Sequence, residues 1–348
     1  MIKYSVGFQL NRPGKEPFLE IVNVYRDSIS EVFFAWPEIA SGRGDVATHC
    51  DATVEEIQQR LVQQLKEIKK IGIKLDLLLN ANCYGADSLS EKLSKQVCTT
   101  IEYLNSVDCG IDIITTTSLA IAHTVKKHFP QIEVRASVNM KIGTVKGMEY
   151  VSDLFDSFHV QREYNRDLYH LKELKAWADK AGKKLVLLAN SGCFAHCSGQ
   201  IFHDNNVAHE EEISRTENIK NFNPYVCWRS LEDEGNWVKL LQNTWIRPED
   251  IHNYEGLFDT VKLATRIHHL PGLVIDAYSK RRYIGNTLDL FEPTFSGALA
   301  PFVIDNTAFP KNWFEKTTSC DKLCYKCSYC KNVLEKVLVN TGDFNEFC

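Results

Sequence analysis

The stretch GIDIITTTSLAIAHTVKKHFPQIEVRASVNM (110–140) shows the pattern that decides the fold of this chain. Its two ends, 110–117 and 133–140, are runs of apolar and β-branched residues, which favour strands. Between them, residues 118–128 place apolar side chains three and four positions apart, as on one face of a helix. A strand, a helix and a second strand in this order predict two parallel strands joined by a helical crossover.

The same alternation runs through most of the 348 residues. Strands are predicted at 3–8, 31–36, 74–81, 110–117, 133–140, 157–161, 183–190 and 258–265. Helices are predicted at 53–71, 86–106, 118–128, 144–154 and 166–181, with Thr53 and Ser88 as N-caps. Eight strands with helical crossovers predict an α/β fold, a parallel sheet closed into a (β/α)8 TIM-like barrel. An open doubly wound sheet is the alternative, but polar residues follow nearly every strand and do not gather at one switch point.

Two tight cysteine groups are the most specific chemical signal. Cys193 and Cys197 lie in SGCFAHCSG, directly after a predicted strand. The second group lies in SCDKLCYKCSYCK and contains Cys320, Cys324, Cys327 and Cys330. Thiolates select zinc or iron–sulfur clusters among the common metals, so both groups indicate metal binding. We therefore predict a barrel over residues 1–290, followed by a Cys-rich C-terminal extension over 291–348 with a metal centre of its own.

The spacing of the second group favours a cluster over zinc. Zinc sites usually pair two short Cys hairpins a dozen or more residues apart, whereas these four thiols are consecutive. The run is closer to a ferredoxin-type 4Fe–4S motif, although the proline that commonly follows is missing. Zinc stays the alternative for this centre. The first three cysteines also fit the C-x3-C-x2-C pattern of radical-SAM enzymes, but those place it after an early barrel strand.

Composition and charge limit the partners. A net charge of −5 gives no general nucleic-acid footprint, although a local basic groove stays open as an alternative. No apolar run approaches the roughly 18 residues of a membrane span. The N-terminal segment MIKYSVGFQL lacks the features of a signal peptide, so we expect a cytoplasmic protein, in which thiols stay reduced.

Several ordered motifs resemble one known family. They are HFPQIEVRASVNMKIGTVKGMEYV (128–151), HVQREYNRDL (159–168), ANSGCFAHCSGQ (189–200), WIRPEDIHNYEG (245–256) and FDTVKLATR (258–266). From about 74 to 290 the chain resembles the collagenase-like peptidases, peptidase family U-32. Despite that label, the better-understood relatives hold a 4Fe–4S cluster through four cysteines. They work in oxygen-independent hydroxylation of quinone precursors or RNA bases.

The resemblance implies a cluster in the barrel. Cys193 and Cys197 straddle a short turn, and Cys227 follows behind Pro224 in NPYVCWRS, where the family usually has two cysteines. Cys83 in NANCYG is the candidate for the fourth ligand. This all-thiolate set suits a 4Fe–4S cluster. Zinc in the same place, or thiols without any metal, are the alternatives.

The predicted catalytic residues lie at the carboxyl ends of the sixth and eighth strands. They are Arg162, Glu163, Lys262 and Arg266. Fixed guanidinium and ammonium groups suit carboxylate or phosphate, so we expect Arg162, Lys262 and Arg266 to bind an anionic substrate or co-substrate. Ordinary ion pairing with Glu163 or Asp259 is the alternative.

We therefore expect an iron–sulfur oxidoreductase that hydroxylates or similarly modifies an aromatic or heteroaromatic substrate, either a small anion or RNA. Such an enzyme needs an electron donor, and homo- or hetero-oligomers are compatible with it. A collagenase-like peptidase is one alternative, but the chain has neither a Gly-x-Ser-x-Gly elbow nor a His-Glu-x-x-His helix. His203 and His209 are six residues apart, so they do not share one helical face. A cluster-bearing electron-transfer or binding protein is the other alternative.

Overall fold

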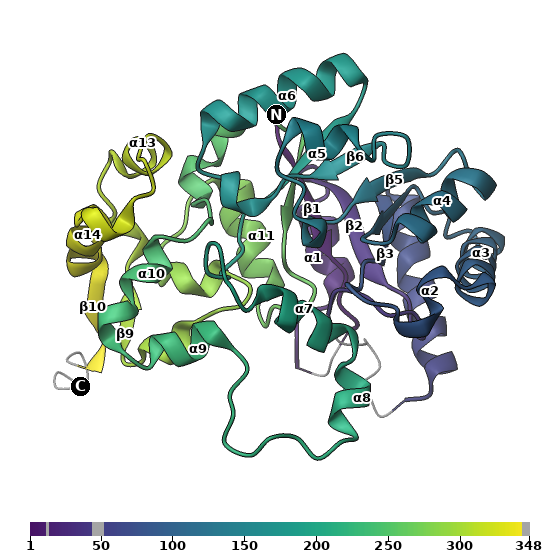
Figure 1. Ribbon diagram of the computed structural model, residues 1–348, viewed down its shortest axis with the longest axis horizontal. Helices are drawn as coiled ribbons and strands as arrows, with labels where there is room; N and C mark the ends of the chain where they lie inside the picture. Colours follow the sequence, from purple (N-terminus) through teal and green to yellow (C-terminus); the bar gives the residue numbers. More distant parts are fainter. Residues whose placement is uncertain (12–13, 44–51, 343–348) are drawn as a thin grey trace.

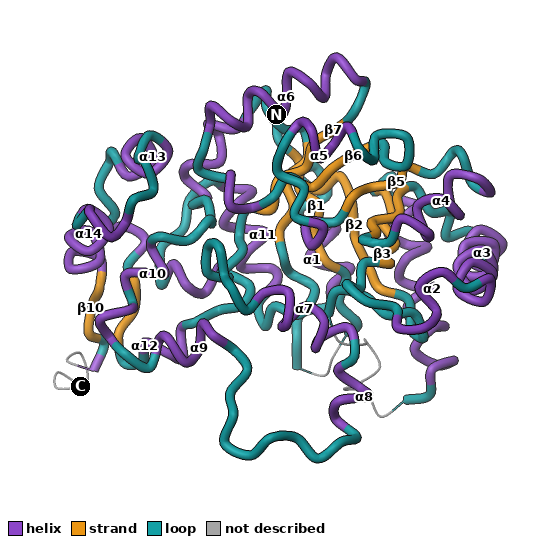
Figure 2. Tube along the Cα trace, in the orientation of Figure 1, coloured by secondary structure: helices purple, strands orange, loops and turns teal. Residues whose placement is uncertain are grey.

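The computed structural model describes residues 1–11, 14–43 and 52–342, and its centre is a closed barrel of eight strands (Figures 1 and 2). The strands are β1 (Lys3–Gly7), β2 (Ile29–Ala35), β3 (Lys74–Leu79), β4 (Ile113–Thr116), β5 (Glu133–Ala136), β6 (Ser157–His159), β7 (Lys184–Leu188) and β8 (Thr260–Leu263). Each strand pairs in parallel with the next, and β8 pairs with β1. The predicted (β/α)8 barrel is confirmed, and closure between β8 and β1 excludes the open sheet.

Helices cover the outside of the barrel. The first six are α1 (Phe18–Val24), α2 (Val54–Lys70), α3 (Glu91–Ser106), α4 (Leu119–His128), α5 (Val145–Glu149) and α6 (Leu168–Ala181). Four short helices follow β7, namely α7 (Gln200–Ala208), α8 (Glu210–Ser214), α9 (Val226–Leu231) and α10 (Val238–Leu241), and α11 (Pro271–Lys280) follows β8. The five predicted helices are all present, while α1 and the helices after β7 were not predicted. None of the helices in the described ranges has the length and apolarity of a membrane span.

The two predicted N-caps have different outcomes. The Thr53 side chain accepts a hydrogen bond from the Glu56 amide, and the Glu56 side chain accepts one from the Thr53 amide, which completes a capping box. Ser88 is a wrong prediction. It lies inside the 3-10 turn Gly85–Leu89, where its hydroxyl donates to the Gly85 carbonyl, and Ser90 caps α3 instead.

The packing of the barrel follows the alternation of side chains along each strand. Val32, Leu75, Leu77 and Val134 join the apolar core between the strands and the helices. The residues in between point inward, and several of them are charged. The apolar layer under the helices therefore holds the barrel closed, and the barrel interior contains charged groups together with apolar side chains such as Phe33.

The C-terminal extension forms a separate layer beside the barrel, drawn in yellow in Figure 1. It contains α12 (Ser296–Leu299), β9 (Phe302–Ile304), α13 (Trp313–Thr318), α14 (Tyr329–Val337) and β10 (Leu338–Asn340). β9 and β10 pair antiparallel, and α14 contacts α10. The extension therefore packs on the helices that follow β7. One of these helices, α9, carries Cys227.

Candidate functional site

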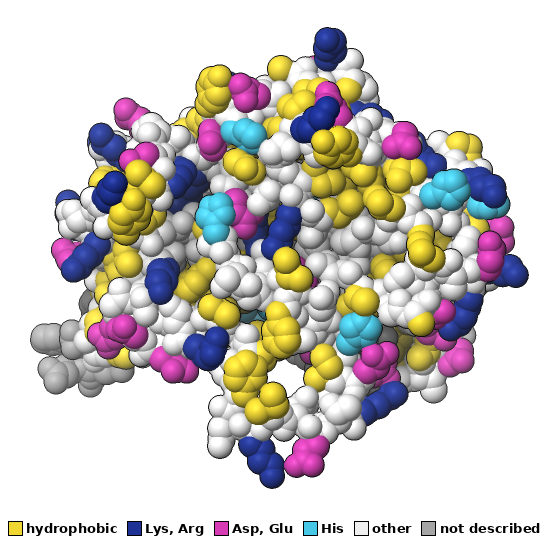
Figure 3. Space-filling model, in the orientation of Figure 1, with side chains coloured by type: hydrophobic (Ala, Val, Ile, Leu, Met, Phe, Trp, Pro, Cys, Tyr) yellow, Lys and Arg dark blue, Asp and Glu magenta, His cyan; other side chains and the backbone are white. Residues whose placement is uncertain are grey.

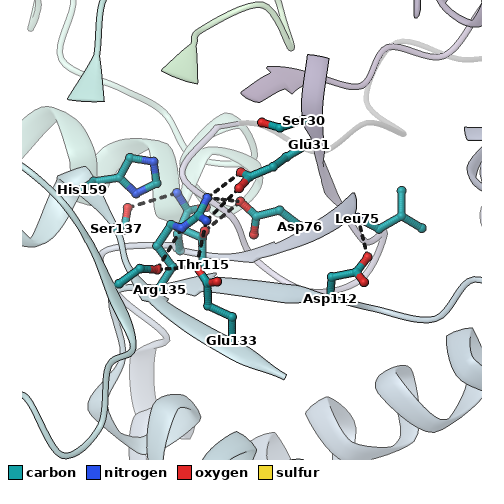
Figure 4. A network of polar contacts seen from close by, with 12 residues as sticks. Ser30, Glu31, Leu75, Asp76, Asp112, Thr115, Glu133, Arg135, Ser137 and His159 are labelled. Atoms are coloured by element: carbon teal, nitrogen blue, oxygen red, sulfur yellow. Dashed lines mark hydrogen bonds and ion pairs between the residues drawn. The ribbon is translucent and has the colours of Figure 1, made fainter. Parts of the chain in front are cut away.

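A buried ion network occupies the centre of the barrel (Figure 4). Arg135 on β5 donates two hydrogen bonds to the carboxylate of Glu31 on β2, with lengths of 2.6 and 2.9 Å. Its Nη2 also donates to Glu133, at 2.9 Å, and its Nε donates to Ser157 Oγ, at 3.0 Å. A fully buried guanidinium needs such partners, because an unpaired charge in the interior costs several kcal/mol, roughly 3–5 when one partner is removed.

Asp76 and Lys262 extend the network from β3 and β8. Asp76 Oδ2 accepts from Thr115 Oγ1 at 2.8 Å and lies 3.8 Å from Arg135 Nη1. Burial raises the pKa of Asp76, and the charge of Arg135 opposes the shift. Burial lowers the pKa of Lys262, whose Nζ lies 4.0 Å from the ring centroid of Phe33. Lys262, one of the predicted site residues, therefore lies buried inside the barrel. Its ammonium group loses a proton more easily than that of a surface lysine.

His159 completes the inner surface on β6. Its Nδ1 lies 3.2 Å from the Ala136 carbonyl oxygen, while its buried Nε2 has no hydrogen-bond partner among the described residues. Burial lowers the pKa of this histidine well below its ordinary value, and the charges of Lys262 and Arg135 add to the shift. The ring is therefore neutral at physiological pH and has a free nitrogen for a ligand or water.

Sequence reasoning missed this central network. Glu31, Asp76 and Arg135 lie inside the predicted strands 31–36, 74–81 and 133–140, and no role is predicted for them. The available signal is a charged residue within a strand that is expected to be buried. Such a charge has to be paired when it is buried, so charges of opposite sign on several strands of one barrel indicate a common polar centre.

Arg162 and Cys193 meet at the mouth of the barrel, where the carboxyl ends of the strands lie. Arg162 is buried. Its Nη1 donates a hydrogen bond to Ser191 Oγ at 3.3 Å, and the distance from its Nε to Glu163 Oε1 is 3.8 Å. Burial opposes its charge, but the nearby Cys193 thiol, hydrogen-bonded to Arg162, and Glu163 raise its pKa. The ion pair with Glu163 is thus present, and Nη2 of the buried guanidinium is left without a partner among the described residues.

Three of the predicted barrel ligands are neighbours at this mouth. Burial raises the pKa of Cys227, and the charges of Cys193 and then Cys197 raise it further. Gly199 permits the approach of the two segments, because a Cβ at this position would lie 2.7 Å from Val226 Cγ2. A larger residue here would separate the start of α7, next to Cys197, from the start of α9, which carries Cys227.

Cys83 has different surroundings. Its thiol accepts a hydrogen bond from the Gly85 amide at 3.3 Å and is hydrogen-bonded to His209. None of the other three predicted ligands is among the described groups that shift the pKa of Cys83. Its role as a fourth ligand stays a prediction that these contacts do not support.

Arg266 lies nearer the surface of the mouth than Lys262. Its Nη1 donates to Ser41 Oγ at 3.1 Å, and its charge contributes to the lowered pKa of Lys262. Gly7 at the end of β1 makes room for it, because a Cβ there would lie 2.4 Å from the Arg266 amide nitrogen. The fold therefore gathers Arg162, Lys262 and Arg266 toward one end of the barrel at different depths.

The four cysteines of the extension are also close to one another. Cys320, Cys324 and Cys327 are exposed, and Cys330 is half-buried. Burial raises the pKa of Cys330 to about 11, with Arg166 opposing this shift and the other three thiols adding to it. Both thiol groups match an iron–sulfur or zinc donor set in chemistry. In the described ranges no three His, Cys, Asp or Glu side chains are yet close enough to hold a metal ion, so binding would have to draw the thiols together.

The outer surface of the molecule carries charges of both signs. On the face drawn in Figure 3, Lys and Arg are interspersed with Asp and Glu, and no large patch of one sign is present. This agrees with the small net charge of −5. The mouth of the barrel, in contrast, carries several positive side chains close together, which would attract an anionic ligand.

The fold and this mouth define a TIM-barrel protein with thiols and cations at the carboxyl ends of its strands. No family model matches the chain. Over 314 residues, 88% of each chain, it is 26% identical to a protein of Methanocaldococcus jannaschii named "Uncharacterized protease MJ1657". The solved structure of the U32 peptidase Mk0906 matches with a TM-score of 0.54 at 15% identity, covering 75% of this chain and 92% of that one. The second match shows the fold alone, and together the two confirm the resemblance to the U-32 peptidases.

Proposed function

We propose that the chain is an iron–sulfur enzyme whose cluster is bound by Cys193, Cys197 and Cys227 at the mouth of the barrel. The observation that supports this proposal is the proximity of these three thiols to one another and of Cys193 to the buried guanidinium of Arg162. Thiolates are the usual ligands of 4Fe–4S clusters, and a fixed positive charge offsets the negative charge of such a site. The cluster would supply one-electron chemistry.

The cations of the mouth suggest the substrate class. Arg162 has an unpartnered N–H among the described residues, and Arg266 and Lys262 extend the positive charge toward the barrel centre. Three fixed cations suit a carboxylate or phosphate group. The mixed charge of the face in Figure 3 favours a small anionic aromatic molecule over RNA as the substrate of an oxygen-independent hydroxylation.

Lys262 would move a proton in this reaction. Burial lowers the pKa of its ammonium, so a larger fraction of the amine is neutral near pH 7 than for an exposed lysine. A buried amine of this kind can accept a proton from a phenol or enol oxygen and return it later. The charge of the nearby Asp76 favours the protonated amine, whereas the charges of Arg135 and Arg266 disfavour it.

Metal analysis tests the cluster proposal. The full chain is purified without oxygen, and iron, sulfide and zinc are measured in C193A/C197A, in C324A/C327A, and in C98A as the control on α3. We expect iron and sulfide in the parent, and loss of the barrel centre's absorbance only in C193A/C197A. C324A/C327A would lose roughly half of the metal, because the tail thiols are local and form a second centre. Abundant zinc without iron would refute the redox proposal.

Peptide hydrolysis is the second candidate function, favoured by the names of the two relatives described above. It predicts cleavage of casein or gelatin by the purified chain. Activity that survives complete removal of iron would separate this function from the cluster-dependent one.

A further inference from the structure

Lys262 is the one buried lysine in the described ranges, with 8% of the residue exposed. Its amine makes no hydrogen bond and no ion pair with any described residue, and its Nζ lies 4.0 Å from the ring centroid of Phe33. Lysines are almost never buried in proteins unless their charge is paired, because an unpaired charge in the interior is costly. This placement therefore favours the neutral amine, which is a nucleophile.

Two oxygen atoms with unused hydrogen-bonding capacity belong to the surroundings of this amine. Ser5 on β1 is the register partner of Lys262 on β8, so both side chains lie on the inner face of the barrel, on strands about 5 Å apart. Ser5 Oγ is buried and has no hydrogen-bond partner in the described part of the chain. Asp76 is the register partner of Phe33, over which the amine lies, and its Oδ1 is likewise buried and unpartnered there (Figure 4).

The electrostatic surroundings agree with this geometry. Burial lowers the pKa of Lys262 to about 8; the charge of Asp76 opposes the shift, and the charges of Arg135 and Arg266 add to it. A lysine with an ordinary pKa is neutral in about one molecule in a thousand at pH 7.5, so the neutral fraction of Lys262 is about a hundredfold larger. A desolvated amine beside other cations is the arrangement that activates lysine as a nucleophile toward carbonyl carbon.

We propose that Lys262 forms an imine with the carbonyl carbon of a 2-oxo acid, whose carboxylate is held by the cations of the mouth. The carboxylate of such a molecule is one bond from its carbonyl, and Arg266, four positions after Lys262, is close enough for its charge to act on the amine. For the anionic group the inference rests on the proposed function; for the covalent step it does not depend on a cluster. It gives the amine a bond to the substrate in addition to the proton transfer proposed above.

The covalent step balances without a redox partner. The neutral amine attacks the carbonyl carbon, a C–N bond forms, and the carbonyl π pair moves onto oxygen. Ser5 Oγ gives its proton to that oxygen and takes one from the nitrogen, which leaves a carbinolamine. The nitrogen lone pair then forms the C=N bond as the C–O bond breaks, and the departing hydroxide takes up a proton to become water. The sum is ketone, amine and one proton to protonated imine and water, with the carboxylate of Asp76 offsetting the charge of the imine.

Reductive trapping in the full chain tests the imine. Pyruvate and sodium cyanoborohydride are added at pH 7.5, and each lysine is followed by peptide mass spectrometry. We expect carboxyethylation of Lys262 to be at least about tenfold faster than that of Lys74, an exposed lysine at the start of β3. K262R keeps a positive charge but forms no imine, so it should lose only this label, whereas K74R should keep it. A rate at Lys262 no higher than at Lys74 would overturn the proposal.

The S5A variant tests whether Ser5 positions and protonates the carbonyl oxygen. It should slow trapping at Lys262 by at least about tenfold. Arylation of the same amine by fluorodinitrobenzene should proceed at the parent's rate, because arylation needs no proton on a carbonyl oxygen. An equal loss in both reactions would show that Ser5 only shapes the surroundings of the amine, and would contradict its part in the step.

A neutral probe separates this inference from the proposed function. Acetone forms an imine without a carboxylate, so the preference for pyruvate over acetone should be larger at Lys262 than at Lys74, and R266Q should reduce it. The label should persist after removal of iron. Labelling of Lys262 without this preference would reject the 2-oxo acid, together with the anion binding of the proposed function. Absence of labelling in a chain that holds iron would reject the imine and leave the cluster proposal standing.

Discussion

His268 makes the stability of the protein depend on pH through a single side chain. It is buried just after β8, and its Nδ1 accepts a hydrogen bond from the Leu270 amide at 3.1 Å. Burial lowers its pKa from 6.5 to about 4, and the neighbouring His269 adds to the shift. The unfolded chain therefore binds a proton that the folded chain excludes between these two pH values.

We predict that H268Q makes the protein less sensitive to acid. The contribution of the neutral ring is complete above pH 6.5 and is lost as pH falls toward 4, by about 2 kcal/mol at pH 5. Urea unfolding at pH 7.5 and pH 5 measures the difference. The parent should lose more stability than H268Q over this interval, and equal losses would show that His268 is not buried in its neutral form.

At the scale of residues, the sequence was informative where chemistry is local. Cys193 and Cys197 are four positions apart, so their proximity follows from the chain itself. The contacts of Cys83 depend on His209, 126 residues later, and no spacing rule connects them. The partners of Arg135 are likewise set by closure of the barrel, which brings β2, β3 and β5 around one axis.

The capping box of α2 shows how much a helix depends on its first residue. Thr53 and Glu56 satisfy each other's backbone amides, and the buried face of α2 includes Ile57, Leu61 and Leu65. The cap therefore fixes where a long helix begins relative to β2 and β3.

We predict that T53A lowers the free energy of unfolding by about 1 kcal/mol, because an amide at the start of α2 loses its acceptor. Thermal unfolding measures the effect. T53S, which keeps the hydroxyl, should stay close to the parent, and a T53S variant as unstable as T53A would show that the lost methyl group, not the cap, is responsible.

Elements were predictable in proportion to their length and regularity. All eight strands were found because each is an apolar run with a polar end, and long helices such as α2 and α6 carry a clear period. Helices α7 to α10 have at most nine residues each and were missed, since a few turns give too little periodicity. Those short helices carry Cys227 and border His209, so the least regular part of the chain holds much of the candidate site.

At the scale of the whole molecule, aromatic rings join the extension to the barrel. Trp245, which follows α10, stacks on Phe291 with centroids 4.8 Å apart and on Trp313 at 5.9 Å. The guanidinium of Arg166 lies 4.5 Å from the Trp245 ring and 5.3 Å from the Trp313 ring. Lys322 donates to the Arg166 carbonyl at 3.0 Å. The cysteine-rich tail is therefore anchored close to the helices that follow β7.

We predict that W313A destabilises the protein by about 3–5 kcal/mol, the usual range for removing a buried aromatic side chain. Trp313 is almost completely buried, whereas Tyr325 in the same extension is 80% exposed. Urea unfolding of W313A and Y325A tests the difference. If W313A were as stable as Y325A, the extension would not be held by this stack.

The stacking of Trp245 on Trp313 also gives the protein an intrinsic spectroscopic signal. Their rings are tilted by only 20° and lie close enough for their electronic transitions to couple, with a cation resting near both. The two indoles come from opposite sides of the junction, so detachment of the extension would uncouple them and change the circular dichroism and fluorescence of the chain. The two indoles can thus show, without any added label, whether the extension is packed on the barrel.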